Sequence, residues 1–188
     1  MTAVSIITPV YNCEAYIEES LQSIVNQREF DDFEWLILND GSQDSTWEKV
    51  TNFNYGWVQD KIRFINDSVN VRIPRRRNAA VQLANGKYIA IHDGDDASLP
   101  DRLRTEFEFL ESHPELFCVG GLAFRMEMDG TPSGMMDYPL ATHEQIVGQM
   151  YRSVNPMIDP TTMFRREGFL ELGGYTLRED IYTVPDMH

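Results

Sequence analysis

Three carboxylates fall within four residues at Asp93, Asp95 and Asp96, directly after the apolar segment Tyr88–Ile91. Ionised carboxylates held this close together repel, and each raises the pKa of its neighbours. A divalent cation removes this conflict, and Mg²⁺ takes hard oxygen ligands, typically one or two carboxylates together with substrate phosphates. The alternative without a bound ion is a solvated acidic turn that caps the next helix. The position directly after an apolar strand favours a Mn²⁺ or Mg²⁺ site.

Arg75, Arg76 and Arg77 form the only dense basic cluster in a chain whose formal net charge is −14. In so acidic a chain, a ligand that carries phosphate needs a local source of positive charge. We expect a helix over Asn78–Asn85 that ends in a left-handed turn at Gly86. The N-terminus of a helix favours anions, so the cluster is either a solvated charge run or an anion site, with Arg77 the best candidate.

The elements that would position these residues alternate between strands and helices. Apolar strands are expected at Val4–Thr8, Trp35–Leu38, Ile62–Ile65 and Tyr88–Ile91, with amphipathic helices between them. This alternation predicts an α/β fold with a mainly parallel sheet and helices on both faces, over about residues 1–115. In open sheets of this class the ligand site lies beyond the carboxyl ends of the strands, where Thr8, Asp40 and Asp93 would converge.

The pattern changes after about residue 115. A strand is expected at Phe117–Gly120, the start of a hairpin at Ala123–Gly130 and a helix at Thr142–Arg152. We see neither internal repeats nor a low-complexity linker. We therefore expect one domain over residues 1–188 with two functional halves.

Composition narrows the class of protein. The chain has 188 residues, 42% of them hydrophobic, which suits one globular domain. It contains no apolar run of the roughly 18–20 residues that cross a bilayer, and it begins without signal-peptide features. We expect a cytoplasmic protein, or one bound peripherally at the inner face of the membrane. The negative charge argues against nucleic acid as a partner.

Five motifs resemble glycosyltransferase family 2, in the family's order and at closely similar spacing. They are Thr8-Pro9-Val10-Tyr11-Asn12, Asn39-Asp40-Gly41-Ser42 with Asp44-Ser45-Thr46, Arg77-Asn78-x-Ala80, Gly86-x-Tyr88-Ile89 and Asp93-Gly94-Asp95-Asp96. The resemblance implies the GT-A fold, a Rossmann-like nucleotide-binding half over about 1–115 joined to an acceptor-side half over about 116–188. It also implies an inverting enzyme that uses Mn²⁺ or Mg²⁺ and a nucleotide diphosphate sugar, most often a UDP-sugar. The acceptor would be a hydroxyl, such as that of a growing glycan or a lipid-linked saccharide.

The resemblance also assigns roles by position. Nucleoside contacts fall on Thr8, Pro9 and Tyr11, the base contact on Asp40, a donor-pocket contact on Arg77, the ribose contact on Asp93 and the metal on Asp95, with Asp93 as a second candidate ligand. Two residues depart from the family pattern. Asn39 stands where many relatives have a second aspartate, and His92 replaces a commonly apolar residue and receives no role.

Inversion needs a general base that removes the proton of the acceptor hydroxyl. In the family this base is the aspartate of a Glu-Asp-like pair that follows a Gly-Gly-aromatic turn, which Gly173-Gly174-Tyr175 matches. We favour Asp186 for its spacing from the turn, and Asp180, which follows Glu179, is the alternative. Relatives usually continue beyond this point, so we expect the chain to be a C-terminally truncated fragment of a longer protein.

Two other functions are alternatives to a glycosyltransferase. A nucleotidyltransferase would normally carry a glycine-rich phosphate loop near its N-terminus, and Thr8–Cys13 contains no glycine. A non-catalytic module or scaffold that binds sugar nucleotides would keep the donor pocket and lack a working base. Whether Asp186 or Asp180 faces the donor site separates this second alternative from an enzyme.

Overall fold

The computed structural model describes residues 2–127, 130–136, 142–152 and 155–177. The strands are β1 (Val4–Val10), β2 (Phe33–Asp40), β3 (Ile62–Asp67), β4 (Tyr88–Ile91), β5 (Cys118–Gly120), β6 (Phe124–Met126), β7 (Pro132–Met135) and β8 (Thr162–Arg165). The helices are α1 (Ile17–Val25), α2 (Thr46–Asn52), α3 (Ile73–Leu83), α4 (Arg102–Ser112), α5 (His143–Met150) and α6 (Arg166–Glu171), with short 3₁₀ turns η1 (Gly56–Lys61) and η2 (Asp159–Thr161).

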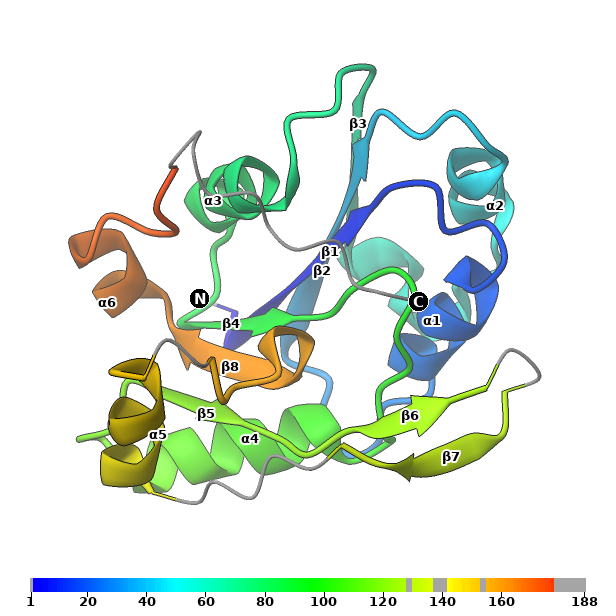
Figure 1. The fold of residues 1–188 in the computed structure, drawn as a ribbon. Coiled ribbons are helices and arrows are strands. Elements are labelled where there is room, and N and C mark those ends of the chain that lie inside the picture. The colour runs from blue at the N-terminus through cyan, green and yellow to red at the C-terminus, as the bar shows by residue number, and fades with distance from the viewer. Residues whose placement is uncertain (1, 128–129, 137–141, 153–154, 178–188) are drawn as a thin grey trace.

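A mixed six-stranded sheet forms the centre of the molecule, in the order β3-β2-β1-β4-β8-β5 (Figure 1). The first four strands run parallel, and β8 runs antiparallel to both of its neighbours. This confirms the predicted α/β fold. The four expected strands and the three helices expected between them are all present and in the expected order.

Alternation along the strands divides the core into two layers. In β1, Ile6 packs with α1, α2 and α4, while its neighbour Ile7 packs with α3 and α6. The same alternation holds in β4, where Ala90 faces the first layer and Ile89 the second. All four side chains are fully buried. Because both faces are covered by helices, the carboxyl edge of the parallel strands is left as the place where polar groups can meet.

The first turn of α3 lies elsewhere than expected. The helix begins at Ile73, five residues before Asn78, with Pro74 in its first turn, where the fixed φ of proline suits a helix start. The arginine cluster is therefore part of the helix. Arg76 and Arg77 lie on its buried side, and each has only about 5% of its surface exposed.

Gly86 does not supply the predicted left-handed turn after α3, because its φ is not positive. Its role is close packing instead. A Cβ atom at Gly86 would lie 2.5 Å from the backbone nitrogen of Ser5 and 2.8 Å from the carbonyl oxygen of Tyr88. The glycine lets the chain enter β4 in direct contact with β1.

The second half of the chain completes the sheet and adds a hairpin. The strand expected at Phe117–Gly120 is β5, and β6 and β7 form the predicted hairpin as a separate antiparallel pair. The sequence did not reveal β8, which lies between β4 and β5 (Figure 1). Across the described segments, no helix is both long and apolar enough to cross a bilayer.

The contact at Gly86 predicts a large stability difference between two glycine substitutions. Gly86→Ala should lower the free energy of unfolding by about 3 kcal/mol, because the new methyl group must displace the backbone of β1. The control is Gly148→Ala in α5, where a Cβ meets nothing within 4 Å. It should stabilise the protein by up to about 1 kcal/mol, since alanine favours helix. Urea unfolding measures both changes, and equal effects would refute the close-packing role.

Candidate active site

Arg77 joins three segments of the chain at the carboxyl edge of the sheet. Its Nη2 atom donates to both carboxylate oxygens of Asp93, at 2.7 and 2.9 Å, just beyond β4. Its Nη1 atom pairs with Asp159 in η2, and its guanidinium lies 5.8 Å from the centre of the Tyr175 ring. Burial would lower the pKa of Arg77, but the two carboxylates raise it above its usual range. The guanidinium therefore stays charged inside this cluster.

The preceding residue, Arg76, makes a second buried pair. Its Nε and Nη2 atoms donate to Oδ1 of Asp40 at 2.9 and 2.6 Å, and Nη1 pairs with Asp67 at the end of β3. The backbone amides of Val71 and Arg72 also donate to the Asp40 carboxylate, each at 3.0 Å. Through these bonds Asp40, which is only 4% exposed, holds the 68–72 loop and α3 against the end of β2.

These pairs alter the electrostatics expected from the sequence. Two of the three clustered arginines are neutralised by protein carboxylates. Arg77 faces two carboxylates, those of Asp93 and Asp159. Burial raises the pKa of Asp93, and Arg77 opposes that rise. A nucleotide diphosphate brought to this edge would meet fixed negative charge, so Arg77 in this arrangement offers it no uncompensated cation.

The Asp93–Asp96 segment is a tight turn that presents Asp95 to solvent. The backbone nitrogen of Asp96 donates to the carbonyl of Asp93 at 3.2 Å, and Gly94 is buried against Val10. The Asp95 side chain is exposed, whereas Asp93 is engaged by Arg77.

No three His, Cys, Asp or Glu side chains in the described ranges are grouped to hold a metal ion by themselves. One exposed carboxylate does fit Mg²⁺ or Mn²⁺ when substrate oxygens complete the coordination, as is usual for Mg²⁺. Asp95, with Asp93 beside it, is the residue that would hold such a cation, and the residues present fit that group.

The predicted nucleoside contacts lie near the end of β1 and differ in accessibility. Tyr11 is 49% exposed, and Pro9 is half-buried. Thr8 is fully buried, and its hydroxyl accepts a 2.9 Å hydrogen bond from the indole of Trp35. Its side chain is therefore committed to the core. The roles of these three residues stay predictions.

The sequence did not predict that two further residues join the cluster around Arg77. Asp159 and Tyr175 both lie against Arg77, and the Tyr175 hydroxyl is 3.4 Å from Asp159. Asn78 holds the Gly173-Gly174-Tyr175 turn by accepting from the Tyr175 nitrogen and donating to its carbonyl, each at 2.9 Å. A lone Asp-Pro in a loop carries no local signal of this pairing, because Arg77 is 82 residues away in the chain. The base candidates Asp186 and Asp180 lie outside the described residues.

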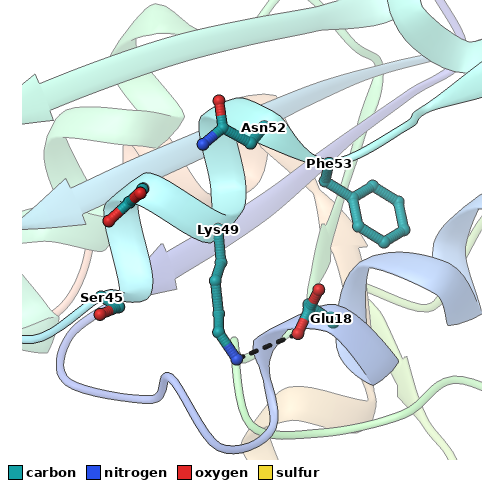
Figure 2. A pocket seen from close by; sticks show the side chains of 6 residues that line it. Glu18, Ser45, Lys49, Asn52 and Phe53 are labelled. Carbon is teal, nitrogen blue, oxygen red and sulfur yellow. Dashed lines mark hydrogen bonds and ion pairs between the residues drawn. The ribbon is translucent and has the colours of Figure 1, made fainter.

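Two surface cavities do not include the residues of the Arg77 cluster. One, of about 300 Å³, is lined by α1 and α2 side chains, with Lys49 bonded to Glu18 at 3.0 Å (Figure 2). The other, of about 290 Å³, adjoins Lys87 and Arg165 at the opposite end of β4. Neither is lined by the acidic residues at the strand ends, so the chemistry of those residues, and not cavity shape, identifies the candidate site.

The buried pairing of Arg77 predicts that its loss lowers the free energy of unfolding more than the loss of an arginine paired at the surface. Arg77→Met should lower the free energy of unfolding by about 3 kcal/mol, because Asp93 is left partly buried without its partner. Arg104→Met is the control, since Arg104 pairs only with carboxylates that are 59–78% exposed. It should cost less than about 1 kcal/mol. Denaturant unfolding compares the two, and similar losses would contradict the role given to Arg77.

The chain matches known proteins over most of its length. The model of the family described as "Glycosyl transferase family 2" covers residues 5–173. EpsE of Bacillus subtilis, which bears the name of a glycosyltransferase, is 31% identical over 207 residues, covering 96% of this chain and 72% of EpsE.

Solved structures show the same fold. S. aureus TarS 1-349 in complex with UDP-GlcNAc has a TM-score of 0.65 at 22% identity, covering 91% of this chain and 47% of that one. The mannosyltransferase PcManGT of Pyrobaculum calidifontis, in complex with GDP-Man and Mn²⁺, has a TM-score of 0.67 at 19% identity, covering 93% and 48%. This chain thus spans about half the length of these two solved chains. The mainly parallel sheet and its flanking helices form the GT-A fold, and the protein belongs to glycosyltransferase family 2.

Proposed function

We propose that this protein is a metal-dependent inverting glycosyltransferase that moves a sugar from a nucleotide diphosphate sugar to a hydroxyl acceptor. The proposal rests on the distribution of charge at the carboxyl edge of the sheet, together with membership of glycosyltransferase family 2. The buried arginines there are already paired, and an exposed Asp95 stands beside a partly buried Asp93. A diphosphate needs a positive partner at this edge, and a divalent cation on Asp95 supplies it.

Relatives support the type of donor. TarS was solved with UDP-GlcNAc, and PcManGT with GDP-Man and Mn²⁺. Another relative, WfaP of Escherichia coli, is named as a UDP-Glc-dependent glucosyltransferase and is 27% identical over 139 residues. We propose a UDP-sugar as the donor of this chain. The nucleoside would lie along Tyr11, Pro9 and the end of β1, the base near Asp40 and the ribose near Asp93.

Transfer with inversion requires removal of a proton from the acceptor hydroxyl and substitution at the anomeric carbon of the donor sugar. The general base, which we assign to Asp186 with Asp180 as the alternative, takes the proton of the acceptor hydroxyl. The resulting oxygen attacks the anomeric carbon from the face opposite the diphosphate. The bond from that carbon to the diphosphate oxygen breaks, and the nucleoside diphosphate leaves. When bound at Asp95, Mn²⁺ or Mg²⁺ would stabilise the negative charge that develops on this leaving group.

The acceptor side falls to the second half of the chain. Asp159 and Tyr175 bring η2 and the 173–175 turn to the donor edge through their contacts with Arg77. We propose that residues of about 116–188 bind a glycan or lipid-linked saccharide, in polysaccharide or glycoconjugate synthesis. A cytoplasmic location, or a peripheral one at the inner face of the membrane, accords with such an acceptor.

Calorimetric titration tests the metal-bridged donor site. UDP should bind the wild-type protein in the presence of Mn²⁺ and at least about tenfold more weakly without it, and Asp95→Ala should abolish the difference. Asp60→Ala removes an exposed acid from η1, near the amino ends of the strands, and should behave as wild type. A parallel titration with GDP tests the choice of base. Equal affinity for UDP with and without Mn²⁺ would refute metal dependence.

Substitution of the two base candidates tests the mechanism. Asp186→Asn should lower the turnover number by about a hundredfold or more and leave UDP binding intact, because the base acts only on the acceptor. Asp180→Asn should have a much smaller effect. The opposite ranking would move the base to Asp180. Full donor binding with no transfer by the wild-type protein to any glycan acceptor would favour a non-catalytic binding module.

A further inference from the structure

His92 is a buried histidine that lies at the end of β4, directly before the acidic turn. It is 1% exposed. Its Nε2 atom lies 2.9 Å from the hydroxyl of Ser20 on α1, and its Nδ1 atom lies 3.0 Å from the hydroxyl of Ser98. The ring thus spans the gap between α1 and the loop that leads into α4.

The Ser20 end of this chain of contacts determines the direction of its hydrogen bonds. The carbonyl of Asp93 can only accept, and the Ser20 hydroxyl donates its single proton to it at 3.1 Å. Ser20 must therefore accept from Nε2–H of His92. In a neutral ring, Nδ1 then accepts from Ser98, whose hydroxyl also accepts from Nη1 of Arg102 at 3.1 Å. Of the two neutral forms of the ring, only the one protonated at Nε2 satisfies every member.

The chain of hydrogen bonds ends on the backbone of the proposed metal turn. The Asp93 carbonyl that accepts from Ser20 also accepts from the Asp96 nitrogen, the bond that closes the turn. Both acceptor positions of this carbonyl are thereby used, and the peptide that leads to Asp95 is held in one orientation. On the other side of the turn, Gly94 is packed against Val10.

A second set of bonds, from α1 and the residues just after it, fixes the loop after the turn. Ser23 accepts from the backbone nitrogen of Ser98 at 3.0 Å, and Gln27 donates to the carbonyl of Leu99 at 2.8 Å. With Ser20, these side chains form a buried polar stripe on α1 and the residues that directly follow it. An apolar stripe would pack as well in this position but would not determine the path of a loop.

We propose that His92 and Ser20 are positioning residues, which hold the Asp93–Asp96 turn in the geometry that lets Asp95 bind a divalent cation together with a nucleotide diphosphate. This inference rests on the proposed function. His92 touches neither cation nor donor; it acts through Ser20 and the Asp93 carbonyl. A ligand held in place before the metal arrives loses less freedom on binding, and groups that orient metal ligands typically change metal affinity by about 10–100-fold.

The test measures how much Mn²⁺ is needed for half-maximal UDP binding, by calorimetry. His92→Leu removes both ring contacts and should raise this concentration about tenfold or more. Ser20→Ala keeps the helix, since alanine favours it, and removes the hydroxyl that joins His92 to the Asp93 carbonyl. It should fold and raise the concentration several-fold. His92→Gln retains a donor that can reach Ser20 and should lie between wild type and His92→Leu.

Tyr55→Phe is the matched control. It removes a buried 2.9 Å hydrogen bond to the Val50 carbonyl, in the same core layer and away from the turn. It should lower the melting temperature and leave the Mn²⁺ requirement at the wild-type value. A rise equal to that of Ser20→Ala would show that the effect is loss of stability, and would overturn the inference.

The remaining outcomes separate this inference from the proposed function. Absence of Mn²⁺-dependent UDP or GDP binding in the wild type would overturn both. Wild-type dependence that is unchanged in Ser20→Ala and His92→Leu would overturn the positioning role alone. In the metal-free protein, nitrogen chemical shifts of the His92 ring at neutral pH should report the neutral form protonated at Nε2, and a form protonated at Nδ1 would contradict the hydrogen-bond chain.

Discussion

Two consecutive arginines on one helix hold the carboxyl edge of this sheet together. Arg76 reaches Asp40 at the end of β2, and Arg77 reaches Asp93 beyond β4, so α3 bridges the strand that lies between them. Successive residues on a helix point about 100° apart, which is why neighbours can serve different strands. Buried charges of this kind are costly to leave unpaired, so each pair constrains the loop that carries its partner.

This arrangement determines what the edge can bind. Protein carboxylates pair with Arg76 and Arg77, so in the proposed function the positive charge for a nucleotide diphosphate would come from a cation. Asp95 is an exposed carboxylate of the turn that could hold it. Arg77 also ties the donor edge to Asp159 and Tyr175 from the second half of the chain. The proposed donor and acceptor sides are thereby in contact through one buried guanidinium.

Local patterns predicted the parts of this fold that depend on local physics. Each apolar strand and its alternation are visible in the sequence, and the acidic turn after β4 follows from its position at a strand end. Long-range pairing was not visible. The four residues of β8 find their place only between β4 and β5, and Asp159 gains meaning only beside Arg77.

Long-range contacts also explain the other differences between sequence and structure. The anion-binding role of Arg77 stays a prediction, and nothing in the local sequence shows that Asp40 and Asp93 pair with Arg76 and Arg77. The left-handed turn predicted at Gly86 was wrong. The tight contact of this glycine with Ser5, which is 81 residues away, is not visible in the local sequence. The sequence assigns no role to His92, because it does not show that Ser20 and Ser98 lie at the two ring nitrogens.

The most direct test is a crystal structure of the protein with UDP and Mn²⁺, with the manganese located by its anomalous scattering. The account predicts a manganese peak bonded to Asp95 and to diphosphate oxygens, with Arg77 still paired to Asp93 and Asp159. A diphosphate held directly by Arg77, with its carboxylate pairs broken and no manganese at Asp95, would contradict it.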